Sequence, residues 1–236
     1  MVALMSADPF DGLRIAQSST AERVSDVIRD LIVRGELLGG SALREHSLRE
    51  SLGVSRNTVR EALRLLSRER LVVYHLHRGV SVRQISAEDV REIFRTREPL
   101  EVVAIEYSRQ APPEALQGLL TPVEVAEAAA RTGDWKAVAT ENLHFHQAIV
   151  DLVGSERISA FFLSLAAELR LAFAEVEHEA PFFSPFLPRN RLLAELIIAG
   201  RVEEACDEMR RYLGEAERLI AAGVTQRSGD VAGAVS

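Results

Sequence analysis

Three arginines recur at helical spacing in a segment that also carries short polar side chains. Arg56, Arg60 and Arg64 are each four residues apart, which places them on one face of a helix, and Asn57 and Thr58 stand at its N-terminal end. A guanidinium can donate two hydrogen bonds to guanine, asparagine can pair with adenine, and the N–H groups of a first helical turn can bind phosphate. The segment predicts a helix that contacts base edges in the major groove. The alternative is a solvated face on which the arginines pair with nearby glutamates.

Polar side chains also interrupt the apolar stripes of the C-terminal half. Six of them lie within or beside such stripes: Arg97, Glu101, Asn142, His146, Asn190 and Tyr212. Burying polar groups is costly unless they find partners, and several that converge inside a bundle indicate a lined cavity. One interpretation is therefore a ligand pocket. The other is a hydrogen-bonded core network in which Arg97 pairs with Glu101.

The elements around the arginine segment predict a small α/β unit over residues 19–84. Apolar periodicity predicts helices over about 20–34, 45–52 and 56–70, with Gly53 ending the second and Ser55 capping the third. Residues 71–74 and 80–82 then alternate like strands around a turn at 75–79. Three helices followed by a hairpin are the layout of a winged helix-turn-helix.

Residues 86–222 show no strand pattern and predict an antiparallel helical bundle. Periodicity and breakers place its helices at about 87–110, 113–120, 122–132, 135–153, 156–178, 190–199 and 201–222. Pro181, Pro185 and Pro188 are expected to lie in a loop. Residues 1–18 are predicted to form a mobile tail and residues 223–236 a disordered one. The fold class is therefore mainly α.

The charge distribution favours a nucleic-acid partner for one unit only. The net charge is −7, yet residues 20–85 hold 12 Arg against 8 Asp and Glu, whereas residues 86–236 hold 15 Lys and Arg against 25 acids. A basic N-terminal unit joined to an acidic C-terminal unit is typical of a protein in which only the first unit binds nucleic-acid phosphates. Cys206 is the only cysteine, so a disulfide framework is excluded. Without an eighteen-residue apolar run or a secretory signal, the chain is expected to be cytoplasmic and to have no membrane partner.

The N-terminal unit resembles the GntR family of bacterial regulators. The similarity rests on residues 48–63 (LRESLGVSRNTVREAL), on Gly35-Glu36-Leu37 and on the run from Leu71 to Val80, although Gly39-Gly40 replaces the usual Pro-Gly and Arg70 replaces a usual glycine. A basic residue near the position of His46 is also typical of the family. The resemblance and the segment chemistry together give these expected DNA contacts: His46, Ser55, Arg56, Asn57, Thr58, Arg60, His77, Arg78 and Gly79.

The C-terminal unit resembles the FCD effector domain of the FadR-like branch, through residues 97–101 (REPLE) and 142–146 (NLHFH). Most members of that branch hold a divalent metal with one Asp and three His, and the metal holds a carboxylate effector. The corresponding residues here are Asn142, His146, Asn190 and Tyr212, so three of the four ligands are replaced. Zinc and similar metals favour His, Cys or carboxylate ligands. We therefore expect no tightly bound metal cofactor, and direct binding of an organic effector by these residues with Arg97 and Glu101.

These observations predict a DNA-binding transcriptional regulator, more often a repressor in this family. It would bind a double-stranded operator as a homodimer, and a small, carboxylate-bearing effector would modulate that binding. An enzyme in the helical unit is a weaker hypothesis because no nucleophile motif, phosphate loop or HExxH accompanies His146, Glu101 and Tyr212. A protein-binding module whose winged unit does not contact DNA is the other alternative. The sequence does not specify the effector, the operator or the sign of regulation.

Overall fold

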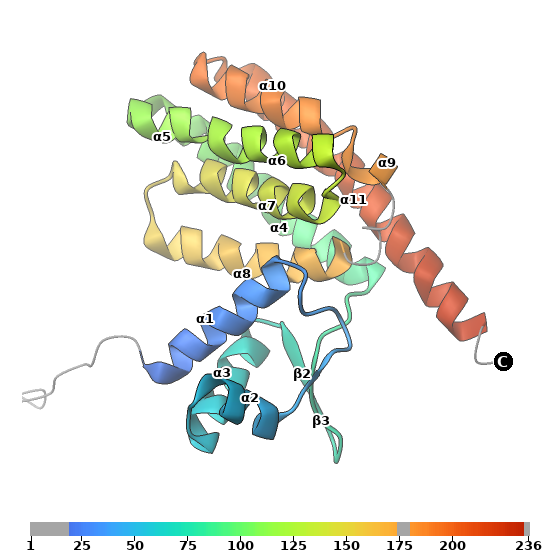
Figure 1. Ribbon diagram of the computed structural model, residues 1–236. Helices are drawn as coiled ribbons and strands as arrows, with labels where there is room; N and C mark the ends of the chain where they lie inside the picture. The colour runs from blue at the N-terminus through green and yellow to red at the C-terminus, as the bar shows by residue number, and fades with distance from the viewer. Residues whose placement is uncertain (1–18, 174–179, 234–236) are drawn as a thin grey trace, which may run out of the picture.

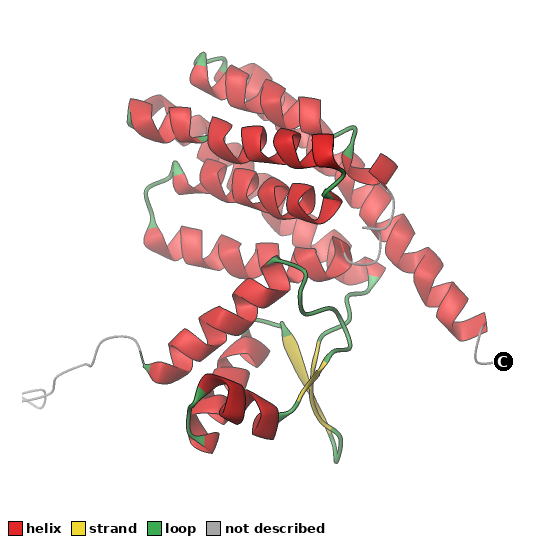
Figure 2. Cartoon of the chain, in the orientation of Figure 1, coloured by secondary structure: helices red, strands yellow, loops and turns green. Residues whose placement is uncertain are grey.

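The computed structural model describes residues 19–173 and 180–233. Its N-terminal part contains three helices and a small antiparallel sheet (Figures 1 and 2). The elements are α1 (Thr20–Val33), β1 (Ala42–Leu43), α2 (Glu45–Leu52), α3 (Arg56–Arg68), β2 (Val72–His75) and β3 (Gly79–Val82). The strand order is β1-β3-β2, with Tyr74 opposite Val80 and Leu43 also opposite Val80. The fold is the winged helix-turn-helix that the sequence predicted.

Local sequence signals account for the boundaries of these helices. Ser19 begins α1 through a capping box with Glu22, and Gly53 ends α2 with a left-handed φ of 64°. Ser55 caps α3, because its Oγ accepts a hydrogen bond from the Thr58 backbone N–H at 3.1 Å. The turn between α2 and α3 therefore fixes where the N-terminus of α3 points.

The C-terminal part is a stack of helices (Figure 1). They are α4 (Ala87–Tyr107), the 3₁₀ turn η1 (Ser108–Gln110), α5 (Pro113–Gly118), α6 (Leu120–Thr132), α7 (Trp135–Asp151), α8 (Glu156–Phe173), α9 (Ala180–Phe183), α10 (Leu187–Ile198) and α11 (Val202–Gly233). Helix α4 packs along α11, and α7 lies between α6 and α8. Among the described residues, no helix is both long enough and apolar enough to cross a lipid bilayer.

Most helix ends lie within three residues of the predictions, and the C-terminal part holds the main differences. Helix α10 begins at Leu187, three residues before the predicted start, because Pro188 is tolerated in a first helical turn. The expected loop also contains the short helix α9. Helix α11 continues to Gly233 instead of giving way to a disordered tail at 223, since buried Ile220 and Val224 extend its apolar face by one turn. The predicted mobile tail 1–18, residues 234–236 and the predicted end of α8 lie outside the described residues.

The winged unit is joined to the helical unit through polar contacts on α8 and α7. The Val33 carbonyl at the end of α1 accepts hydrogen bonds from Arg170 Nε at 2.9 Å and Thr140 Oγ1 at 3.4 Å. Gly35 follows with a φ of 63°, and a Cβ there would overlap the Arg170 guanidinium. Glycine is therefore favoured at this position, because its backbone conformation is one that other residues rarely adopt and because any side chain here would have to displace the Arg170 guanidinium.

Candidate DNA-binding surface and effector cavity

The N-terminal end of α3 presents the side chains that the sequence predicted to contact DNA. Asn57 is exposed, and the side chains of Arg56 and Arg60 are 64% and 46% exposed. Ser55 and Thr58 hydroxyls lie 2.8 Å apart, so part of their hydrogen-bonding capacity is used within the cap. Val59, Ala62, Leu63 and Leu66 are buried on the opposite face of the same helix. The burial pattern therefore leaves this polar face available to a partner.

Glu45 on α2 links the two arginines, a role that the sequence reasoning missed. Its carboxylate accepts hydrogen bonds from Arg56 Nε at 3.1 Å and from Arg60 Nε at 3.0 Å. Burial acts to raise the pKa of Glu45, but the hydrogen bonds from Arg60 and Arg56 outweigh it and lower this pKa overall. Because each arginine uses Nε here, the terminal Nη groups are left for other acceptors. The only sequence signal was an acid at the start of the preceding helix.

The neighbouring basic side chains are arranged in different ways. His46 is exposed, with Nδ1 at 3.5 Å from Arg49 Nη2 and Nε2 at 3.3 Å from Glu50. Arg64 lies 3.7 Å from Glu61, as the solvated-face alternative predicted for that arginine. Glu69, which follows the end of α3, pairs instead with Arg29 on α1. The three arginines of this face therefore all have acidic neighbours and all remain substantially exposed.

The tip of the wing is exposed and has an unusual backbone. His77 and Gly79 have positive φ values of 62° and 84°, and Arg78 between them points into solvent. Leu76 is 85% exposed at the same tip. Arg70, where the family usually has glycine, also has a left-handed φ of 60°. The family's preference for glycine at this position is explained by the left-handed backbone, which glycine adopts without strain.

In the helical unit, Glu101 joins two basic side chains in a buried cluster. Arg97 Nε donates to one carboxylate oxygen at 2.8 Å, and His146 Nδ1 bonds the other. Glu101 and His146 are fully buried, and Arg97 is 2% exposed. The Arg97 guanidinium also lies 5.0 Å from the Phe94 ring centre and 5.9 Å from that of Phe162. The Arg97–Glu101 pair of the core-network interpretation is therefore present.

The charge states of this cluster follow from its surroundings. Burial opposes ionisation of Glu101, but Arg97 and His146 outweigh it and lower the pKa of its carboxyl. Burial lowers the pKa of His146 despite the attraction of Glu101. Glu101 is thus an ionised carboxylate that accepts a hydrogen bond from the Nδ1–H of a neutral His146 imidazole. His146 Nε2 is then a hydrogen-bond acceptor.

A second cluster centres on the Asn142 amide. Its Oδ1 accepts hydrogen bonds from Asn190 Nδ2 at 2.8 Å and from the Tyr212 hydroxyl at 2.7 Å, and all three residues are buried. The rings of Tyr212 and His146 lie 5.0 Å apart. Burial raises the pKa of Tyr212. The fold therefore brings together Asn142, His146, Asn190 and Tyr212, the four residues that the family resemblance predicted to lie together.

These four side chains do not fit a divalent metal. They supply one neutral imidazole, two amides and a phenol that burial keeps protonated, without any thiolate or carboxylate among them. Within the part of the chain that the structure describes, no group of three or more His, Cys, Asp or Glu could hold a metal ion.

Three buried polar atoms in this region lack a hydrogen-bond partner among the described residues. They are Arg97 Nη2, His146 Nε2 and Asn190 Oδ1. A cavity of about 10 Å³, roughly the space of one water, is lined by Arg97, Asn142 and Tyr212 together with seven apolar residues. Orphaned buried donors and acceptors of this kind need a water or a ligand to satisfy them.

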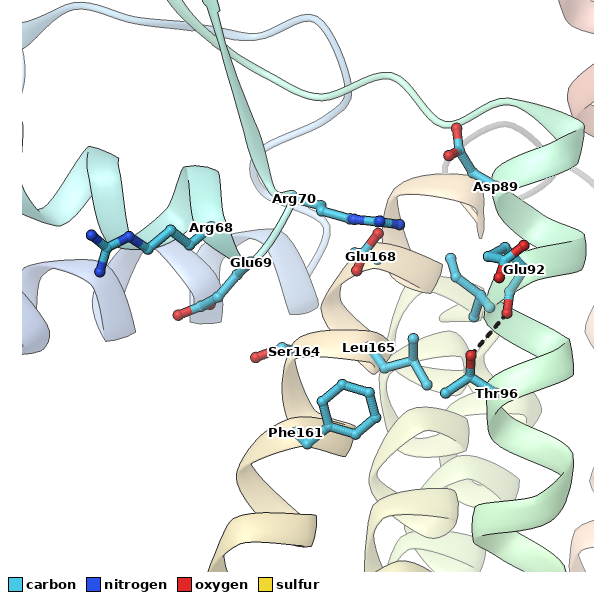
Figure 3. A pocket seen from close by; sticks show the side chains of 11 residues that line it. Arg68, Glu69, Arg70, Asp89, Glu92, Thr96, Phe161, Ser164, Leu165 and Glu168 are labelled. Atoms are coloured by element: carbon cyan, nitrogen blue, oxygen red, sulfur yellow. Dashed lines mark hydrogen bonds between the residues drawn. The ribbon is translucent and has the colours of Figure 1, made fainter.

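A wider cleft of about 430 Å³ separates the winged unit from the helices (Figure 3). Arg70 reaches across it toward Glu168 on α8 (Figure 3). Two of its carboxylates have the same partner, since Arg83 bonds buried Glu168 at 3.1 Å and also bonds half-buried Asp89. The cleft therefore serves as a charged junction between the two units.

Comparisons with known proteins cover both units. The family model "Bacterial regulatory proteins, gntR family" matches residues 20–82, and the FCD domain model matches residues 92–215. The chain is 34% identical to the HTH-type transcriptional regulator YdhC of Bacillus subtilis over 202 residues, which cover 80% of this chain and 90% of YdhC. It is 26% identical to a transcriptional repressor named for a D-xylose utilization operon of Paenarthrobacter nicotinovorans, covering 81% and 84% of the two chains.

Solved structures show the same architecture. A transcriptional regulator from Rhodococcus sp. RHA1, described as GntR, aligns with a TM-score of 0.78 and 34% identity over 87% of this chain and 99% of that one. McbR of E. coli aligns with a TM-score of 0.76 over 90% and 100% of the two chains, and its 21% identity supports the fold alone.

Proposed function

The chain belongs to the GntR family of bacterial transcriptional regulators and carries an FCD domain, and from this premise we propose that it is an operator-binding repressor controlled by a carboxylate effector. The observation that carries the DNA-binding part is the exposed polar face of α3, where Arg56, Asn57 and Arg60 stand opposite a buried apolar face. Relatives named as repressors of xylose and gluconate operons support the sign of regulation. A homodimer on a two-fold operator completes the proposal.

Arg56 and Arg60 are the proposed base- and phosphate-binding side chains, with Asn57 and Thr58 beside them. Their exposure and the free Nη groups left by the Glu45 contacts support this assignment. Ser55, His46 and the wing residues His77, Arg78 and Gly79 are proposed to contact the backbone or the minor groove. The wing tip supports this by its full exposure.

For the effector, Arg97 is the proposed anchor of the carboxylate. Its Nε is held by Glu101 while Nη2 is buried without a partner, so a bound anion would complete its hydrogen bonding. His146 Nε2 and Asn190 Oδ1 do not line the cavity, and each would accept a hydrogen bond from a buried water. We propose that this binding needs no metal, because the donor set around Asn142 suits hydrogen bonds better than coordination.

Helix α8 is proposed to couple the cavity to the DNA-binding unit. Phe173 near its end lines the cavity, Phe162 lies beside Arg97, and Glu168 and Arg170 contact the winged unit. A ligand that moves α8 would change the orientation of the head and hence the population that can bind DNA.

Fluorescence anisotropy on DNA from upstream of the chain's own gene tests the proposal. The Arg56→Ala and Arg60→Ala variants are expected to lose about 10- to 100-fold in operator affinity, since a base-contacting arginine contributes about 1–3 kcal/mol. Arg91→Ala is the matched control, because Arg91 is an exposed arginine on α4 paired only with Glu88 in the described structure. If both α3 variants bind as tightly as the wild type, the assignment of this face is wrong.

Two further measurements complete the test. Affinity should fall steeply with salt if phosphates are contacted, whereas a protein-binding module would show no such DNA binding. Native mass spectrometry together with metal analysis is expected to report a dimer with less than stoichiometric metal. A stoichiometric divalent metal would refute the metal-free site.

A further inference from the structure

The cavity beside Arg97 is lined by three polar and seven apolar residues. Its polar lining is limited to Arg97, Asn142 and Tyr212. Tyr212 already donates its hydroxyl proton to Asn142, and Asn142 Oδ1 accepts two hydrogen bonds. The Arg97 Nη2 group is the buried cation donor in this lining that lacks a partner among the described residues. The polar part of the lining therefore matches a single anionic head group.

The rest of the lining is hydrocarbon. It consists of Phe94, Phe173, Phe182, Phe183, Phe186 and Ile220, with Ala216 beside them. These rings contact each other edge-on, with the Phe182 and Phe183 centres 4.8 Å apart and those of Phe173 and Phe183 5.2 Å apart. Such a surface gains energy by covering apolar atoms and offers no hydrogen bond to a hydroxyl.

From this division we infer that the effector is a monocarboxylate with a hydrocarbon body, and that polyhydroxylated sugar acids are rejected. The inference rests on the proposed function, because it specifies the ligand class of the same site. It sets this chain apart from the relatives named for gluconate and xylose operons.

Two physical points support the inference. The first is that each ligand hydroxyl buried against phenylalanine rings loses its water without replacement, which weakens binding by roughly tenfold or more. The second is that a carboxylate on Arg97 gains a charge-assisted hydrogen bond in a site that excludes water. A six-carbon acid without hydroxyls therefore binds far better than a six-carbon sugar acid.

The hydrocarbon body needs space that the rings now fill, because the cavity holds about 10 Å³. Binding must displace phenylalanine side chains, and Phe182 and Phe183 on the four-residue helix α9 are the proposed ones to move. A ring that leaves is replaced by ligand hydrocarbon, so the apolar contacts of the remaining rings are kept.

Isothermal titration calorimetry on the purified full chain, with EDTA present, tests this with matched probes. Hexanoate and gluconate are both six-carbon monocarboxylates that differ in their hydroxyls, and hexanamide is a neutral counterpart of hexanoate. Phenylacetate supplies an aromatic body. We expect hexanoate and phenylacetate to bind, with gluconate and hexanamide at least 100-fold weaker than hexanoate.

The variants tie any binding to this cavity. Arg97→Met is expected to abolish hexanoate binding, and Arg91→Met, which removes an exposed arginine from the same helix, is expected to retain it. Arg97→Met also leaves Glu101 buried without its cation, which destabilises the fold. The comparison of hexanoate with hexanamide on the wild-type chain therefore tests the contact between the carboxylate and Arg97 without a substitution.

Each outcome decides the question. Gluconate binding as tightly as hexanoate, and lost in Arg97→Met, overturns the ligand class while the proposed effector site stands. Hexanoate binding that equals hexanamide binding, or no binding of any probe, also overturns the inference. Operator binding in the anisotropy assay then shows separately whether the regulator function holds.

Discussion

The Arg97–Glu101 pair should be among the strongest couplings in the molecule, and a double-mutant cycle measures it. The two side chains are 3% and 0% exposed and are joined at 2.8 Å. Removing one charge leaves the other buried without compensation, so Arg97→Met and Glu101→Leu are each expected to cost about 3–5 kcal/mol. The double variant leaves only the His146 Nδ1–H without its acceptor, at about 1–3 kcal/mol. The interaction energy is therefore expected to be about 3 kcal/mol or more.

Urea unfolding at pH 7.5 measures these free energies. Trp135, the only tryptophan, begins α7 and reports on the helical unit, while circular dichroism reports on the whole chain. Glu88→Leu with Arg91→Met forms a matched cycle at an exposed pair on the same helix, where about 0–1 kcal/mol is expected. If Arg97→Met costs less than about 1 kcal/mol, or the two buried substitutions add, Glu101 is not the desolvated partner that the structure indicates.

Three further outcomes follow from single residues. The free energy of unfolding should fall as pH drops below about 6.5, because His146 takes up a proton in the unfolded chain while burial lowers its pKa in the folded one. Urea unfolding of the His146→Gln variant should show no such decline. If the variant and the wild type lose stability equally, His146 is not the group responsible. Arg70→Gly should raise the free energy of unfolding by about 1 kcal/mol, because glycine adopts the φ of 60° without strain. A fall of similar size in the same urea measurement would mean that the attraction of Arg70 to Glu168 stabilises the fold more than the backbone strain destabilises it. Glu45→Gln should reduce the ratio of operator affinity to non-specific DNA affinity about tenfold, because glutamine orients Arg60 less firmly and the loss of a negative charge favours any DNA. An unchanged ratio in the anisotropy assay would exclude a role for Glu45 in orienting Arg60.

The fold could be predicted in outline because each helix carries its own periodic signal and its own cap. Ser55, Gly53 and the apolar face of α3 are local features, so the recognition helix could be placed from the sequence. Strand β1 could not, since two residues have no periodicity and are defined by pairing with β3. The start of α10 was missed because proline was taken as a breaker where it is compatible with a first turn.

The candidate site was predictable as a set of residues but not as a set of contacts. Spacing of four within apolar stripes identified Arg97 with Glu101 and Asn142 with His146, because that spacing shares a helix face. The bond between Asn142 and Asn190 joins residues 48 apart, and the pairing of Glu45 with Arg60 joins two helices. Such contacts depend on how helices cross, which the pattern of one helix does not encode.

The retained residues of the helical unit explain why the replaced ones are tolerated. Glu101 binds His146 and Arg97 at once, so losing any of the three would strand a buried polar or charged group. At the other three positions, Asn190 and Tyr212 both donate neutral hydrogen bonds to Asn142, and Asn190 Oδ1 is the acceptor that still needs a partner. A neutral cluster does not need a metal charge to hold it together, and it leaves Arg97 as the positive group beside the aromatic rings. Arg97 is the cation beside this neutral cluster and the aromatic rings, and this is the electrostatic reason for proposing it as the anchor of an anionic effector.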